Sequence, residues 1–174
     1  VNEYTLSTAW DVSSASFVDS FGVSSQETKL SGIAFSNSGM KMFIVGYDGD
    51  DVNEYTLSTA WDVSSASFVD SFSIASEETV PGGIEFSNSG MKMFIAGTTG
   101  DDISEYTLST AWDVSSASFV DSFSVASQDT FPTGIEFSKS GMKMFVLGAA
   151  GDDVNEYTLS TAWDVSSASF VDSF

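Results

Sequence analysis

Three acidic turns hold the residues of this chain that are best suited to binding a cation. In each turn a glycine precedes two aspartates, and a Glu follows three positions after the second of them. The aspartates are Asp50 and Asp51, Asp101 and Asp102, and Asp152 and Asp153. Clustered carboxylate oxygens are ligands that Ca²⁺ prefers, although this spacing differs from that of an EF-hand loop. The turns are therefore predicted sites for Ca²⁺ or another hard cation, and the plainer alternative is an ordinary hairpin turn, where Gly-Asp pairs are common.

Four tryptophans, each followed directly by an aspartate, form a second set of candidates. They are Trp10, Trp61, Trp112 and Trp163. An indole ring beside a carboxylate suits stacking against a sugar, so these residues are candidate glycan ligands. The alternative, which we favour, is that each indole fills the gap between adjacent structural units, because large aromatic side chains are usually buried.

Two further carboxylates, Glu85 and Glu136, lie in short apolar stretches that end at a turn. If Asn88 and Ser89 form a two-residue hairpin turn, Glu85 faces Lys92 across the pair of strands, and Glu136 faces Lys143 in the same way. Opposite charges across an antiparallel pair stabilise it by about 0.2–1 kcal/mol. This structural pairing is favoured over a ring of carboxylates that binds a cation in a central channel.

The composition excludes several classes of function. The 174 residues include 25 acidic and five basic ones, and the net charge is −20. The basic residues are all lysines, and the chain has no Arg, His or Cys. Binding to nucleic acid or to an anionic membrane is disfavoured by this charge, and no apolar run is long enough to insert into a membrane. A Ser-His-Asp or Cys-His system and a His/Cys zinc site need residues that are absent, so no catalytic residues and no enzyme are predicted.

These candidate residues belong to a repeat with a period of 51 residues. The stretch VNEYTLSTAWDVSSASFVDSF begins at Val1, returns at Val52 and Val154, and occurs with two changes from Ile103. In the unit 73–123, runs rich in β-favouring residues at 83–87, 91–96, 103–108 and 119–125 are separated by turn residues rich in Gly, Asn and Ser. No stretch has helical spacing. The sequence therefore predicts an all-β fold of four short antiparallel strands per unit.

A single four-stranded sheet with large apolar residues on both faces must be covered by copies of itself, and radial stacking of such sheets gives a β-propeller. We therefore predict blades at 22–72, 73–123 and 124–174, preceded at 1–21 by the outer two strands of another blade. Propeller rings have about four to eight blades. Three and a half blades should not close alone, so the chain is expected to be part of a longer array or to associate with other copies.

The inner strands add a resemblance to known families. The segment from Pro132 to Val146, PTGIEFSKSGMKMFV, resembles the opening of YVTN- and NHL-type propeller repeats. The whole chain is similar to tandem propeller repeats of bacterial surface proteins and phage-associated proteins. The resemblance implies a propeller fold and says little about activity, because propellers host many functions.

The predicted function is that of a non-enzymatic structural repeat protein whose blades stack into a ring or a self-associating array. Near-identical blades present the same groups repeatedly, which suits structural repetition better than a site built from a few unlike groups. The expected partners are other copies of the chain or further repeats, and the expected setting is extracellular, on a cell surface or in a virion. The alternative is a ligand-binding propeller for glycans or for Ca²⁺-dependent adhesion.

Overall fold

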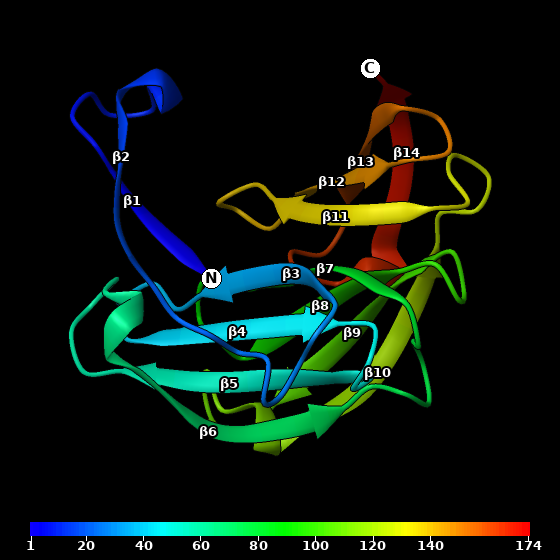
Figure 1. The fold of residues 1–174 in the computed structure, drawn as a ribbon. Coiled ribbons are helices and arrows are strands. Elements are labelled where there is room, and N and C mark those ends of the chain that lie inside the picture. The colour runs from blue at the N-terminus through cyan, green and yellow to red at the C-terminus, as the bar shows by residue number, and fades with distance from the viewer.

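The computed structural model describes all 174 residues and contains four antiparallel sheets (Figure 1). A two-stranded sheet comes first and three four-stranded sheets follow, so the predicted all-β, propeller-type fold of four-stranded blades is confirmed. We call each four-stranded sheet a blade and the two-stranded sheet the half-blade. The half-blade holds β1 (Asn2–Leu6) and β2 (Ala15–Ser20); the first blade holds β3 (Leu30–Phe35), β4 (Lys41–Gly46), β5 (Asp51–Leu57) and β6 (Ala66–Ser73); the second holds β7 (Pro81–Phe86), β8 (Lys92–Gly97), β9 (Asp102–Leu108) and β10 (Ala117–Ser124); the third holds β11 (Pro132–Phe137), β12 (Lys143–Gly148), β13 (Asp153–Leu159) and β14 (Ala168–Ser173).

The strands of each sheet follow one another in sequence order, so every sheet is a simple meander. The only helical segments are four single 3₁₀ turns between the third and fourth strand of each unit: η1 (Val12–Ser14), η2 (Val63–Ser65), η3 (Val114–Ser116) and η4 (Val165–Ser167). The half-blade corresponds to β5 and β6 of a complete blade, since its sequence is the same. It therefore lacks the inner pair of strands.

The expected pairing of Glu85 with Lys92 is wrong, and so is that of Glu136 with Lys143. Glu85 lies opposite Phe94, and Glu136 lies opposite Phe145. The reason is the length of the turn: the Ser87 N–H donates to the Lys92 carbonyl (3.0 Å), which leaves four residues in the loop instead of two. The longer loop moves the partner of Glu85 two residues along β8, and Lys92 bonds instead to Glu105 of β9.

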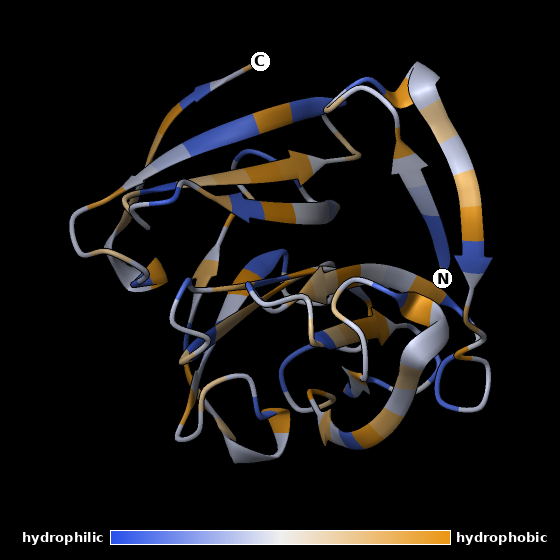
Figure 2. Ribbon diagram, turned by 90° about the vertical axis from the view of Figure 1, so that its left-hand side faces the viewer, coloured by the Kyte–Doolittle hydropathy of each residue, from blue (hydrophilic) through white to orange (hydrophobic).

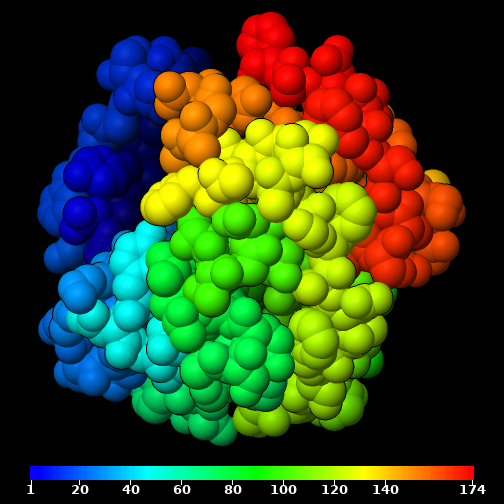
Figure 3. Space-filling view, turned by 90° about the vertical axis from the view of Figure 1, so that its right-hand side faces the viewer, coloured from blue at the N-terminus to red at the C-terminus, as the bar shows by residue number.

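The core lies between the sheets and not within a single one. Three apolar clusters each join the facing sides of two consecutive sheets. Phe43 of β4 packs on Phe86 of the second blade with ring centroids 4.4 Å apart, and Phe94 packs on Phe137 of the third in the same way, at 4.5 Å. Hydrophobic and hydrophilic residues alternate along parts of the strands (Figure 2), because successive side chains of a strand point to opposite faces of the sheet. The third blade packs directly against the second (Figure 3).

Candidate functional site

The loop that carries each Trp-Asp pair is capped in the same way in all four units. The Asp113 carboxylate accepts the Ser115 N–H at 3.1 Å and the Ser115 hydroxyl at 2.6 Å, which caps the 3₁₀ turn η3. Trp112 has a positive φ of 62°, and its N–H donates to the Gly90 carbonyl at 2.9 Å. The indole lies directly on Gly90, where a Cβ would overlap it. Gly90 itself has φ +68°, so a glycine is needed there for both space and conformation.

A Lys–Glu pair of one blade binds this loop of the next blade. Lys92 Nζ lies 2.6 Å from Glu105 Oε1, and Glu105 is only 2% exposed. Glu105 Oε2 accepts the backbone N–H of Val165 at 3.0 Å. Lys92 Nζ donates to the carbonyl of Trp163 at 2.6 Å. We call this Lys–Glu pair the junction clamp, because its two charges satisfy two backbone groups of the neighbouring blade.

The junction clamp occurs again between the first and second blades. Lys41 Nζ lies 2.6 Å from Glu54 Oε1, donates to the Trp112 carbonyl at 2.7 Å, and leaves Glu54 Oε2 to accept the Val114 N–H at 3.0 Å. In the half-blade, Glu3 Oε2 accepts the Val63 N–H at 3.0 Å, although the strand that would carry the lysine is missing. The side of a sheet that carries the clamp is called the front face below, and the side that carries the Trp-Asp loop is called the back face.

Aromatic contacts surround each junction clamp. At the junction between the second and third blades, called the second junction below, Phe94 of the front face lies 6.1 Å from the Trp163 ring, measured between centroids. Phe123 meets Tyr157 there edge to face at 5.5 Å. Edge-to-face pairs contribute about 0.5–1.5 kcal/mol beyond their buried area. Each junction thus combines an ionic clamp with aromatic packing.

The half-blade leaves its back face uncovered. Four large apolar residues are exposed there: Tyr4 (55%), Leu6 (38%), Trp10 (96%) and Val12 (83%). Their counterparts in the second blade include Tyr106, Leu108 and Val114, which are at most 1% exposed. The half-blade therefore presents the surface that the other blades bury.

The third blade leaves its front face uncovered. Lys143 Nζ lies 2.6 Å from Glu156 Oε1, but no backbone group reaches this clamp, and its side chains are 49% and 30% exposed. Leu147, Val154 and Phe174 are also exposed, whereas Ala96 and Ile103, the counterparts of the first two, are fully buried. A hollow lined by Phe145, Val154, Glu156, Asp172, Ser173 and Phe174 lies on this face.

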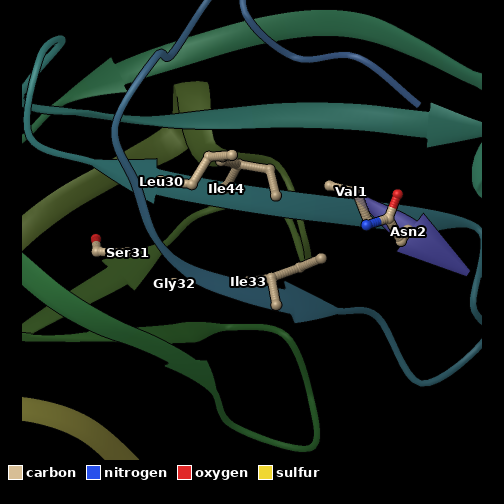
Figure 4. A pocket seen from close by; sticks show the side chains of 7 residues that line it. All are labelled: Val1, Asn2, Leu30, Ser31, Gly32, Ile33 and Ile44. Carbon is tan, nitrogen blue, oxygen red and sulfur yellow. The ribbon is translucent and has the colours of Figure 1, made fainter. Parts of the chain in front are cut away.

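A second hollow lies beside the half-blade, where its inner strands are missing. Figure 4 shows this hollow between β1 and β3; it is lined by Val1, Asn2, Leu30, Ser31, Gly32, Ile33 and Ile44. Leu30 and Ile33 are each about half exposed. No titratable side chain lines it, so it offers apolar contact and no catalytic group.

The four tryptophans proposed as ligands lie in three environments. Trp112 and Trp163 are partly buried at the junctions, where Trp112 packs on Phe86 of its own blade and Phe43 of the preceding one. Trp61 is 54% exposed and packs on Phe35. Trp10 is almost fully exposed.

The aspartates proposed as metal ligands do not converge. Asp50, Asp101 and Asp152 adopt positive φ values of 49–56°, and Asp51 accepts the Asn53 side-chain N–H at 2.7 Å; Asp153 accepts that of Asn155 in the same way. Burial raises the pKa of Asp51 and of Asp102. No group of three or more acidic side chains is placed to hold a metal ion. Calcium binding at these turns stays a prediction, which a melting temperature measured with millimolar Ca²⁺ and again with a chelator tests.

Sequence reasoning missed a second set of carboxylates, Glu27, Glu78 and Asp129, which are 1–2% exposed. Glu78 accepts the Thr99 N–H at 3.2 Å through both oxygens and so fixes the turn between β8 and β9. Gly97 permits this approach, because a Cβ there would overlap the Glu78 carboxylate. The available signal was position: an acidic residue recurs at the same point of the linker in each unit.

The inner carboxylates Glu85 and Glu136 belong to neighbouring blades. Burial, with the negative charge of Glu136 as a second cause, raises the pKa of Glu85 to about 7. The corresponding residue of the first blade is Ala34. The pair is therefore an acidic feature of the inner strands that no lysine neutralises, since Lys92 and Lys143 bond to Glu105 and Glu156.

No protein-family model matches the sequence, and no curated protein matches it either. Among solved structures, the chain is similar to a functionally unknown protein from Desulfotomaculum acetoxidans (19% identity, TM-score 0.61), with 99% of this chain covering 48% of that one. It is similar to a periplasmic gluconolactonase from Pseudomonas aeruginosa (16% identity, TM-score 0.55, covering 82% of this chain and 38% of that one). It is also similar to the β-propeller domain of Cps50 (Swd1) from Myceliophthora thermophila (13% identity, TM-score 0.56, covering 83% of this chain and 42% of that one).

These similarities establish the fold alone. The chain spans about half the length of the first of these proteins and less of the other two. No helix in the structure is long and apolar enough to cross a membrane. We conclude that the chain consists of β-propeller-type blades in tandem.

Proposed function

We propose that this chain is a non-enzymatic structural repeat module whose end blades associate with further blades of the same kind, so that chains stack into a ring or an extended array. One observation carries the proposal. The residues that are buried at each internal junction are the ones left exposed on the half-blade and on the third blade. Exposed apolar surface of this extent is a typical mark of an interaction site.

The absence of catalysis is part of the same proposal. Some proteins with a similar fold are named as gluconolactonases, so lactone hydrolysis is the activity to test. No titratable side chain lines the open hollow beside the half-blade, and the near-identical blades supply no unlike acid and base. Hydrolysis of gluconolactone or 6-phosphogluconolactone by the purified chain would overturn this part of the proposal.

An extracellular, cell-surface or virion setting also belongs to the proposal. It is supported by the resemblance of the inner strands to YVTN- and NHL-type repeats and by the net charge of −20, which keeps unassembled chains apart in solution.

Sedimentation velocity and native mass spectrometry over a range of concentrations test the assembly itself, with electron microscopy of the products. We expect masses at multiples of 18.5 kDa that grow with concentration, and images of rings or filaments. A particle of 18.5 kDa at every concentration would refute the proposal.

Glycan binding is the second candidate, because Trp10 is almost fully exposed and Trp61 is half-exposed. A glycan array and intrinsic tryptophan fluorescence distinguish the two functions. A bound glycan whose signal is lost in both Trp10→Ala and Trp61→Ala would favour this second function.

A further inference from the structure

The two ends of the chain carry complementary halves of one junction, and the internal junctions show how they fit. Every unit repeats after 51 residues. The third blade therefore relates to the next unit as the second relates to the third. At that junction the front face supplies Lys92 and Glu105, and the back face supplies the Trp163 carbonyl and the Val165 N–H.

Resting on the proposed function, we propose that the junction clamp of the third blade binds the Trp10–Val12 loop of a second copy of this chain. Glu156 Oε2 accepts the Val12 N–H of the second copy, and Lys143 Nζ donates to its Trp10 carbonyl. The occupant is a second copy because the clamp binds the Trp112–Val114 and Trp163–Val165 loops inside the chain, and the exposed Trp10–Val12 loop has the same sequence.

The polar half-sites match one to one. Glu156 Oε1 already holds Lys143 at 2.6 Å, as Glu105 Oε1 holds Lys92, and its second oxygen bonds to nothing. On the half-blade, the Val12 N–H and the Trp10 carbonyl likewise have no partner, whereas the corresponding groups of Val114 and Trp112 are bonded to the first blade. The Asp11 carboxylate caps the loop in the free chain, with the Ser13 N–H at 3.0 Å, so the docking conformation is already formed.

The apolar half-sites match as well. At the second junction Phe123 of the front face meets Tyr157 of the back face, which predicts contact between Phe174 and the Tyr4 of a second copy. Phe174 and Tyr4 are exposed in the single chain. The Phe94–Trp163 contact corresponds in the same way to Phe145 with Trp10 of the second copy. Tyr4 and Trp10 of one end thus correspond to Phe174 and Phe145 of the other.

Two variants separate this junction from other modes of association. Val12→Pro removes the N–H that Glu156 would bind. Val12 is the first residue of η1, where proline is well tolerated, and Asp11 before it is already extended at φ −98° and ψ 98°. Glu156→Gln removes the charge of the clamp and keeps its shape. Asp48→Asn is the matched control, because it removes one negative charge from an exposed ion pair with Lys29, outside both ends.

The assay is sedimentation velocity of the full chain at physiological ionic strength and above, where repulsion between the acidic copies is screened. We expect each of the two variants to weaken assembly about 10- to 100-fold, as for loss of a hydrogen bond to a charged group, and Asp48→Asn to leave it unchanged. Mixing the Val12→Pro and Glu156→Gln chains should restore one intact junction and give a 1:1 pair that grows no further.

The outcomes distinguish this inference from the function on which it rests. Wild-type chains that stay monomeric at every concentration overturn both. Wild-type assembly that neither variant weakens leaves the structural function standing and overturns the junction. Failure of the mixed variants to pair, when each is folded by circular dichroism, overturns the head-to-tail arrangement.

Discussion

Replacing Glu105 by Gln tests whether the junction clamp holds neighbouring blades together. The substitution keeps the shape of the side chain but removes the charge that pairs with Lys92 and leaves one oxygen to serve two donors. Breaking a buried ion pair from one side costs about 3–5 kcal/mol. Since the Lys92 side chain is 28% exposed, water compensates part of this loss, and we expect about 2–3 kcal/mol.

That loss corresponds to a melting temperature lower by about 4–12 °C for a chain of this size. Glu156→Gln is the matched control, because it removes the same charge from the same pair at the open end, where its side chain is 30% exposed. An exposed pair contributes less than about 1 kcal/mol. In dilute solution, where chains are separate, this variant should lower the melting temperature by less than about 4 °C.

Differential scanning calorimetry at micromolar concentration, with urea unfolding followed by circular dichroism, measures both variants. Glu54→Gln repeats the experiment at the first junction, where the geometry is the same. Equal falls for Glu105→Gln and Glu156→Gln would refute the argument, because the two pairs differ in burial and in the backbone groups that they bind.

Three further predictions concern single residues. Trp112→Ala should cost about 3–5 kcal/mol in urea unfolding because the ring packs on both blades, whereas Trp10→Ala, at 96% exposure, should change stability by less than about 0.5 kcal/mol. The pKa of Glu85 is raised from 4.5 to about 7, so between these pH values the folded chain holds a proton that the unfolded chain releases, and the melting temperature should fall as the pH rises from about 4.5 to about 7. Glu85→Gln should remove part of this fall, because Asp51 and Asp102 act in the same direction. A wild-type melting temperature that does not change over this pH range would contradict the prediction. Gly90→Ala should unfold the second blade's Trp loop and lower stability by more than about 1 kcal/mol, measured against Gly22→Ala, where a Cβ meets nothing within 4 Å.

Much of the fold follows from the repeat. The 51-residue period, the alternation of turn residues with β-favouring runs and the incomplete first unit predict the strands, their order and the half-blade. Prediction failed at the turn between β7 and β8. Gly90 lies in the left-handed region to make room for Trp112, a residue 22 positions away, and the resulting four-residue loop shifts the partner of Glu85. Turn length that depends on a distant side chain is not encoded locally.

The candidate site was harder to predict than the fold. The clamp joins Lys92 to a glutamate 13 residues away and then to backbone groups 71 and 60 residues away. Backbone donors and acceptors carry no sequence signal, so only the three-dimensional arrangement shows them. Glu78 was missed for a different reason: acidic residues are usually exposed, and its burial depends on Gly97, which lies at the end of β8.

The groups exposed on the two end units determine what kind of contact two copies can make. A symmetric contact would need one surface to fit itself, yet the two open faces carry different groups: a clamp on the third blade and a Trp-Asp loop on the half-blade. Two clamps facing each other would bring Glu156 against Glu156 and leave the backbone groups of both loops unsatisfied. Association of unlike faces is therefore favoured, and it repeats at each end of the product, so assembly either closes into a ring or continues as an open array. The proposed contact between two copies therefore uses the same kinds of group as the contact between two blades of one chain.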